Sequence, residues 1–109
     1  MSLKLPPAVA TYFDAANDGN AEGAAQCFAE DAVVRDEGRE MLGRAAIRAW
    51  KDESHKKYAP VATPLEASES GSRLTVVAQV AGTFPGSPLP LRYLFTLGAS
   101  GIAALAIST

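Results

Sequence analysis

The sequence has little of what metal sites and disulfides require: it contains one cysteine, Cys27, and one histidine, His55, among 109 residues. A single thiol cannot close an internal disulfide, and one thiol with one imidazole cannot supply the ligands of a zinc site. No D-x-D-x-D-G calcium loop is present either. We therefore expect no metal, no cofactor and a reducing compartment, the cytoplasm.

The sequence also has little excess of either charge, because it contains twelve acidic and ten basic residues and its formal net charge is −2. Basic residues gather between Arg35 and Lys57, but acidic residues are interleaved with them. This mixture offers no basic surface to a phosphate backbone, so we expect no nucleic-acid partner. No apolar run approaches the roughly 18 residues of a membrane span, and the first seven residues lack the apolar core of a signal peptide.

What is present suits one domain spanning residues 1–109, because 48% of the residues are hydrophobic. The first third has helical spacing. Pro6-Pro7 suits a helix start, and the pattern breaks at Gly19. Asn20 can cap a second, short helix that includes Cys27 and Phe28. The apolar stripe of the first helix recurs at i, i+3, i+4 and i+7: Val9, Tyr12, Phe13 and Ala16.

A short strand pair is expected next, at 32–36 and 41–42, followed by a third helix from Arg44 to about Tyr58. The remaining sequence alternates with period two. It predicts strands at 65–69, 74–81, 89–97 and 102–107, with turns between them. Three helices and an antiparallel meander make an α+β fold. We expect the curved antiparallel sheet to wrap the helices as a cone-shaped half-barrel whose mouth is a ligand pocket.

Three segments carry a family resemblance: YFDAANDGNAEGA at 12–24, FAEDAVVRD at 28–36 and GRAAI at 43–47. They resemble the nuclear transport factor 2-like superfamily, and are most similar to its SnoaL-like and ketosteroid isomerase-like members. The resemblance covers the chain in element order and implies a cone-shaped α+β roll, usually a dimer. Members isomerise, cyclise, dehydrate or only bind partners, so the fold alone does not fix the chemistry.

The resemblance to ketosteroid isomerases implies a catalytic pair, because Tyr12 and Asp36 match their tyrosine and aspartate without a gap. A carboxylate there takes a proton from the carbon beside a carbonyl, while a phenol donates to the enolate oxygen. The isomerases' second donor is an aspartic acid, and its position matches Tyr93. The positions of two supporting tyrosines hold Phe28 and Lys51, which departs from the isomerase pattern.

Each candidate also has a structural interpretation. Asp36 can be a solvated carboxylate at a strand end, and Tyr12 and Tyr93 can simply pack in the core. His55 lies at the edge of the inner face of the third helix, which favours a rim position, and Cys27 suits a small buried hydrophobe better than a nucleophile. Four aromatic residues are expected either as core or as walls that contact substrate: Phe28, Trp50, Tyr58 and Phe95.

Two hypotheses of different class follow. The first is a cofactor-free isomerase, cyclase or dehydratase acting on an apolar carbonyl compound, with Asp36 as base and Tyr12, with Tyr93, as oxyanion donors. The second is a non-catalytic ligand-binding or dimeric interaction module of the same fold. Because Val77 and Leu94 alternate with inward residues and are themselves apolar, we also expect a homodimer through the outer face of the sheet.

Overall fold

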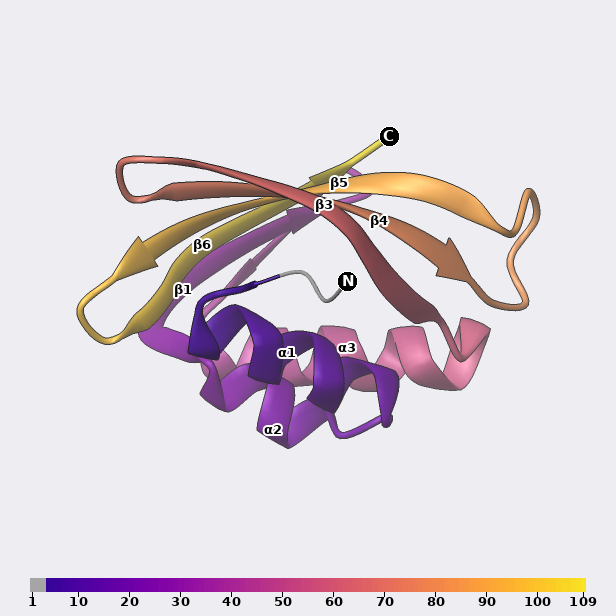
Figure 1. The fold of residues 1–109 in the computed structure, drawn as a ribbon. Helices are drawn as coiled ribbons and strands as arrows, with labels where there is room; N and C mark the ends of the chain where they lie inside the picture. Colours follow the sequence, from indigo (N-terminus) through magenta and orange to yellow (C-terminus); the bar gives the residue numbers. More distant parts are fainter. Residues whose placement is uncertain (1–3) are drawn as a thin grey trace.

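A curved sheet of six strands lies over three helices in the computed structural model, which describes residues 4–109 (Figure 1). The first three residues of the segment assessed for a signal peptide lie outside this range. The helices are α1 (Pro7–Asn17), α2 (Ala21–Gln26) and α3 (Arg44–Tyr58). The strands are β1 (Phe28–Asp36), β2 (Arg39–Leu42), β3 (Val61–Ser70), β4 (Arg73–Ala81), β5 (Leu89–Gly98) and β6 (Gly101–Ser108).

The α1–α2 hairpin forms as its sequence predicts. Proline occupies the first turn of α1, Gly19 adopts a φ of +74° in the connection, and the Asn20 side chain accepts a hydrogen bond from Gly23 N. The second helix is shorter than expected, however, because it ends at Gln26. Phe28 instead begins β1, where it pairs with Ile102 of β6. This long-range strand pairing overrides the local helical pattern.

The sheet order is β2-β1-β6-β5-β4-β3. The meander from β3 to β6 and the early hairpin β1–β2 are antiparallel, as expected, but β1 and β6 pair in parallel and join these two parts. The α+β class is therefore confirmed, whereas the sheet is mixed and unclosed rather than wholly antiparallel. Pro64 lies inside β3, where it is tolerated because β3 is an edge strand.

The buried side chains of the helices and of the concave face of the sheet form one core cluster, and Figure 1 shows the two layers that enclose it. Alternate residues of β4 are buried, in the predicted phase: Leu74, Val76, Ala78 and Val80. The edge strand β3 is held to α1 by the Asn17 side chain, whose Nδ2 donates to Ala62 O at 2.9 Å and whose Oδ1 accepts from Ala62 N at 2.8 Å. This amide completes strand-like pairing for an edge that would otherwise face water.

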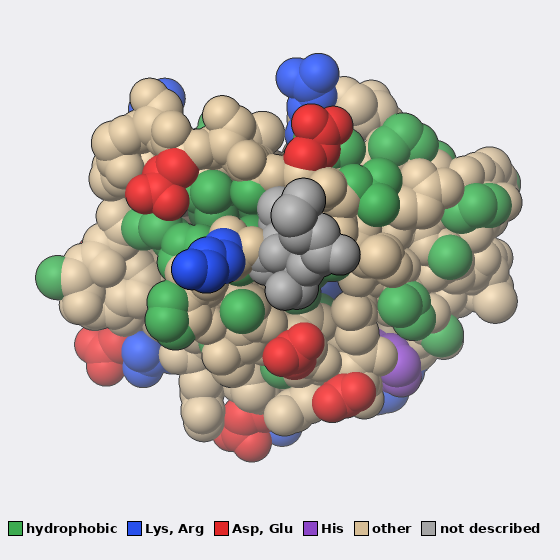
Figure 2. All heavy atoms as spheres, viewed as in Figure 1, with side chains coloured by type: hydrophobic (Ala, Val, Ile, Leu, Met, Phe, Trp, Pro, Cys, Tyr) green, Lys and Arg blue, Asp and Glu red, His purple; other side chains and the backbone are tan. Residues whose placement is uncertain are grey.

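The opposite, convex face of the sheet carries none of the three helices (Figure 1). Leu94 is 38% exposed there, and its register partners on the same face are Thr75 of β4 and Ala106 of β6. Charged side chains are spread over the face viewed in Figure 2, without a cluster of one sign. No helix within residues 4–109 is both long enough and apolar enough to cross a membrane.

We predict that the convex face pairs two copies of the chain, because burying the exposed Leu94 and the half-buried Val77 would remove apolar surface from water. Light scattering at micromolar concentration should give the mass of a dimer. The variant Leu94→Glu should give a monomer with an unchanged circular dichroism spectrum. A monomeric parent protein would contradict the prediction.

Candidate functional site

A cavity of about 920 Å³ opens between α3, the β1–β2 turn and the adjoining ends of β4, β5 and β6. Its volume lies within the range typical of small-molecule sites. Apolar side chains from β4 and β5, including Val80 and Leu91, form one wall, and α3 contributes Trp50 and Tyr58 to another. We call this space the main cavity.

Asp36, the last residue of β1, lines the main cavity as expected. Its Oδ2 accepts a hydrogen bond of 3.2 Å from Trp50 Nε1, which fixes the carboxyl group against α3. Burial raises the pKa of Asp36, while the hydrogen bond from Trp50 partly opposes that shift. The result is a partly desolvated carboxylate in a cavity lined by both apolar and charged side chains, a placement suited to proton transfer.

Tyr93 of β5 also lines the main cavity. Burial raises the pKa of its phenol, and the nearby charge of Asp36 raises it further. The hydroxyl therefore keeps its proton at neutral pH and can donate a hydrogen bond to a ligand oxygen. Asp36 and Tyr93 thus share one space, as the resemblance implies.

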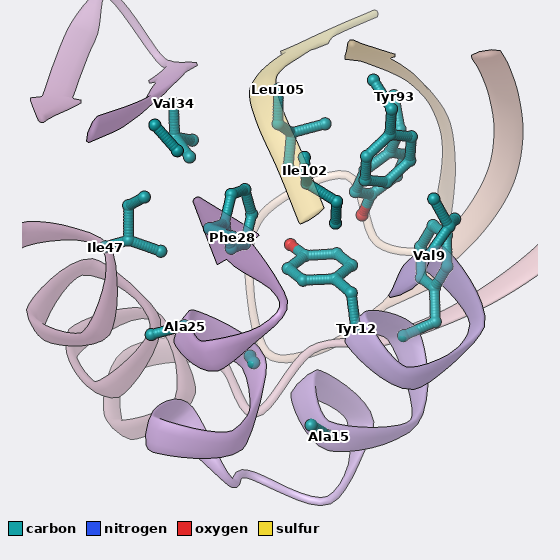
Figure 3. Packing of buried hydrophobic residues seen from close by; sticks show 14 of the residues in the cluster. Val9, Tyr12, Ala15, Ala25, Phe28, Val34, Ile47, Tyr93, Ile102 and Leu105 are labelled. Carbon is teal, nitrogen blue, oxygen red and sulfur yellow. The ribbon is translucent and has the colours of Figure 1, made fainter. Parts of the chain in front are cut away.

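Tyr12 lies next to the main cavity but is not part of its lining. Its side chain is 1% exposed, it does not line the main cavity, and its hydroxyl has no hydrogen-bond partner among residues 4–109. The ring packs edge-on against Phe13, Phe28 and Phe95 at centroid distances of 5.4 to 5.8 Å. Figure 3 shows the hydroxyl on the Phe28 side of the ring. The structure therefore buries Tyr12 in the core beside the main cavity, where it lines a small void with Lys51 and Tyr93 and does not line the main cavity with Asp36.

Of the four expected wall aromatics, Trp50 and Tyr58 line the main cavity, but Phe28 and Phe95 do not. Both phenylalanines are 0% exposed and belong to the core layer beneath the cavity (Figure 3 shows Phe28). A wall aromatic that sequence reasoning missed is Phe84, in the β4–β5 connection. Its ring lies edge-on to Tyr58 with a centroid distance of 5.8 Å.

The β4–β5 connection is fastened to the end of α3, which shapes the mouth of the main cavity. Thr83 N donates to Tyr58 O at 2.9 Å, and Thr83 Oγ1 donates to Lys57 O at 3.2 Å. A Cβ on Gly82 would lie only 2.7 Å from Tyr58 O, so this close approach requires glycine. The two hydrogen bonds of Thr83 therefore hold the neighbouring Phe84 at the mouth of the main cavity.

Lys51 is the main functional candidate that sequence reasoning placed only as a departure from the isomerase pattern. It lines both the main cavity and a small adjoining void of about 20 Å³. Its Nζ lies 4.7 Å from the centroid of the Trp50 ring and 5.5 Å from that of Tyr12. The sequence did indicate that Lys51 faces inward, because it follows Ile47 by four residues and so lies on the same, inward face of α3.

Neither His55 nor Cys27 lines the main cavity. The His55 ring lies over the α1–α2 connection, where a Cβ on Gly19 would be 2.6 Å from its Nε2. Cys27 donates a weak hydrogen bond to Gly23 O at 3.4 Å, and burial raises the pKa of its thiol. Within the described residues, no three His, Cys, Asp or Glu side chains gather as a metal ion would need.

Three helices packed in the concavity of a curved mixed sheet, together with a match to the SnoaL-like family model, define a protein of the nuclear transport factor 2-like superfamily. The family model for the SnoaL-like domain matches residues 9–101. The chain therefore belongs to the SnoaL-like domain family. A search of curated proteins finds no match.

Solved structures agree with this placement. A Sinorhizobium meliloti protein provisionally named a polyketide cyclase is 42% identical, with a TM-score of 0.91 and 95% of each chain covered. A Catenulispora acidiphila protein with a ketosteroid isomerase-like fold, solved with trimethylamine, is 23% identical, with a TM-score of 0.86 over 97% of this chain and 87% of that one. An epoxide hydrolase/cyclase-like enzyme, SalBIII, of salinomycin pyran-ring formation is 22% identical, with a TM-score of 0.76 over 93% and 86%.

Proposed function

We propose that the protein binds an apolar carbonyl compound in the main cavity and acts on it by cofactor-free acid–base chemistry of the isomerase or cyclase type. The observation that carries this proposal is the position of Asp36. Its carboxyl group lines a ligand-sized cavity with an apolar wall from β4 and β5 and charged residues around the rest, and one of its oxygens is held by Trp50. A carboxylate at such a place has a burial cost that packing alone does not repay.

In this mechanism, Asp36 is the base that removes a proton from the carbon beside the ligand's carbonyl group. Trp50 fixes Oδ2, so Oδ1 is the oxygen that receives the proton. Tyr93 donates a hydrogen bond to the carbonyl oxygen as negative charge develops on it. Trp50, Tyr58 and Phe84 hold the apolar body of the ligand. Tyr12 has no contact with the ligand in this arrangement.

The provisional name of the Sinorhizobium protein supports a polyketide-like ligand, because a cyclase of that class acts on compounds rich in carbonyl groups. At 42% identity over 95% of both chains, this neighbour is the most similar of the three described above. Ring closure between a carbon acid and a carbonyl begins with the same proton abstraction by a base. We therefore extend the proposal to ring-forming as well as double-bond-shifting reactions.

A panel of enones and polycyclic ketones tests this proposal. Binding is followed by quenching of the fluorescence of Trp50, the only tryptophan. Enolisation is followed by NMR, as loss of the α-proton signal in deuterated water. We expect at least one ligand to bind and to exchange its α-protons faster with the protein than without it. Binding of several ligands with no exchange above the buffer rate would overturn the catalytic proposal.

A second candidate function is ligand binding without catalysis, alone or within a dimer. One observation favours it: the hydroxyl of Tyr12, which the family resemblance pairs with Asp36, is sealed in the core. An oxyanion site with Tyr93 as its single phenol is weaker than one with two donors. The exchange experiment separates the two functions, since a binding module leaves α-protons in place.

The variant Tyr12→Phe tests the assignment of Tyr12 to the core. A buried hydroxyl without a partner destabilises the folded state, so its removal should raise the free energy of unfolding by about 1 kcal/mol. α-Proton exchange should be unchanged. Urea unfolding and the exchange assay provide the two measurements, with Tyr93→Phe as the matched control that lowers exchange. Loss of exchange in Tyr12→Phe would show that its hydroxyl reaches the ligand.

A further inference from the structure

Lys51 combines a cationic side chain with an unusually apolar position. It projects from α3 to the junction of the main cavity and the small void, next to the rings of Trp50 and Tyr12. Within residues 4–109 it forms no ion pair, and the carboxylate whose charge acts on it, Asp36, lies beyond ion-pair distance. Its charge is therefore supported by the two ring faces and, from beyond ion-pair distance, by the charge of Asp36.

This environment makes the amine available in its neutral form. Burial lowers the pKa of Lys51 to about 8, and the charge of Asp36 only partly opposes the shift. At pH 7 about a tenth of such amines are unprotonated, against less than about a thousandth for an ordinary lysine. The ionisable groups facing it from the other elements are Asp36 of β1, Tyr12 of α1 and Tyr93 of β5. Both phenols keep their protons at this pH, because burial raises their pKa values.

We propose that Lys51 is a nucleophile that forms an imine with an aldehyde or ketone group of a ligand in the main cavity. The Nζ lone pair attacks the carbonyl carbon, and the carbonyl π electrons move to oxygen. Asp36 relays one proton from the attached nitrogen to that oxygen, which gives a carbinolamine, and then relays the second, so that the hydroxyl leaves as water while the nitrogen lone pair forms the C=N bond. Amine and carbonyl thus become imine and water, and hydrolysis reverses the step without a further reactant.

The imine deepens the proposed acid–base function, on whose carbonyl ligand it rests. A protonated imine withdraws electrons from the neighbouring carbon more strongly than a carbonyl group does, so Asp36 can remove the α-proton more readily. The cavity then needs fewer oxyanion donors, which agrees with the sealed position of Tyr12. Lys51 thereby serves as the electron-withdrawing partner of the base.

Reductive trapping tests the nucleophile directly. The protein is mixed with benzaldehyde and sodium cyanoborohydride at pH 7, and benzylated positions are located by peptide mass spectrometry. Lys51 should be labelled at least about tenfold faster than Lys57, because burial lowers the pKa of Lys51 whereas the neighbouring Tyr58 raises that of Lys57, so the neutral fraction of Lys51 is much larger. Its labelling rate should level off above about pH 8, while that of Lys57, whose pKa is raised by the neighbouring Tyr58, should still increase there.

The variants Lys51→Met and Lys51→Arg should both lack the rapid benzylation at position 51. Lys51→Arg keeps the positive charge, so it separates the loss of the amine from the loss of charge. The matched control is Lys56→Met, which removes an exposed lysine paired with Asp52 and should leave labelling of Lys51 unchanged. Equal labelling of Lys51 and the exposed lysines in the folded parent would overturn the proposal. Trapping at Lys51 with no α-proton exchange would instead leave the nucleophile standing and remove the acid–base function.

Discussion

The variant Asp36→Asn is expected to reduce protein-catalysed α-proton exchange of a bound ketone by a factor on the order of 10² to 10⁴. Asparagine keeps the shape of the side chain, and its oxygen can still accept the hydrogen bond that Trp50 Nε1 donates at 3.2 Å. The basic carboxylate alone is lost. Exchange rates measured by NMR at saturating ligand give the comparison.

The same variant should retain its fold and gain slightly in free energy of unfolding, because the burial cost of a partly desolvated charge disappears. Asp52→Asn is the matched control: it makes the same chemical change on the exposed face of α3, where Asp52 pairs with Lys56 at 3.1 Å. Its exchange rate should equal that of the parent. Full exchange in a folded Asp36→Asn protein would exclude Asp36 as the base.

The pH profile provides an internal check on this role. Asp36 must be ionised to act as a base, so exchange should increase with pH through its pKa. Burial raises that pKa above the ordinary value of an aspartic acid, about 3.9. The rising limb of the profile should accordingly have its midpoint above that value, and the limb should vanish in Asp36→Asn.

The variant Phe28→Ala is expected to lower the free energy of unfolding by about 3 to 5 kcal/mol. Phe28 is 0% exposed and contacts the Tyr12 ring edge-on at a centroid distance of 5.6 Å, so truncation leaves a void in the layer between the helices and the sheet. Urea unfolding followed by circular dichroism measures the loss.

Phe84→Ala is the paired variant, because Phe84 lines the mouth of the main cavity and is only partly buried. It should cost less stability than Phe28→Ala and weaken ketone binding more. The reverse pattern, with Phe28→Ala folded nearly as stably as the parent but defective in binding, would place Phe28 in the cavity wall after all.

The spacing of apolar residues predicted the helices and strands whose conformation depends mainly on neighbouring residues in the sequence. The helix 44–58 and the alternating burial of β4 follow from spacing alone, and both appear at the expected residues. The second helix was predicted too long because Phe28 has no local feature that marks it as a strand residue. Its strand state depends on Ile102, at the other end of the chain, whose backbone N donates to Cys27 O at 2.9 Å.

The dependence on contacts distant in sequence also explains why only some of the predicted site residues line the main cavity. Periodicity correctly directs Tyr12, Phe95 and Tyr93 inward, but it does not say how deep each lies below the cavity. Tyr93 reaches the open space, whereas Tyr12 and Phe95 fill the layer beneath it. Lys51 shows the converse error, because a lysine is ordinarily expected to face solvent even when its position in the helix faces the core.

The position of β6 between β1 and β5 has a consequence for the order of folding. During synthesis, β1 leaves the ribosome early, but its parallel partner is the last strand of the sheet to be made. Until then, the β1–β2 hairpin and the strands β3 to β5 have no ladder connecting them. Closing contacts so distant in sequence is slow. Unfinished chains therefore expose the edges of β1 and β5 to other chains, and chaperone binding would be most valuable at that stage.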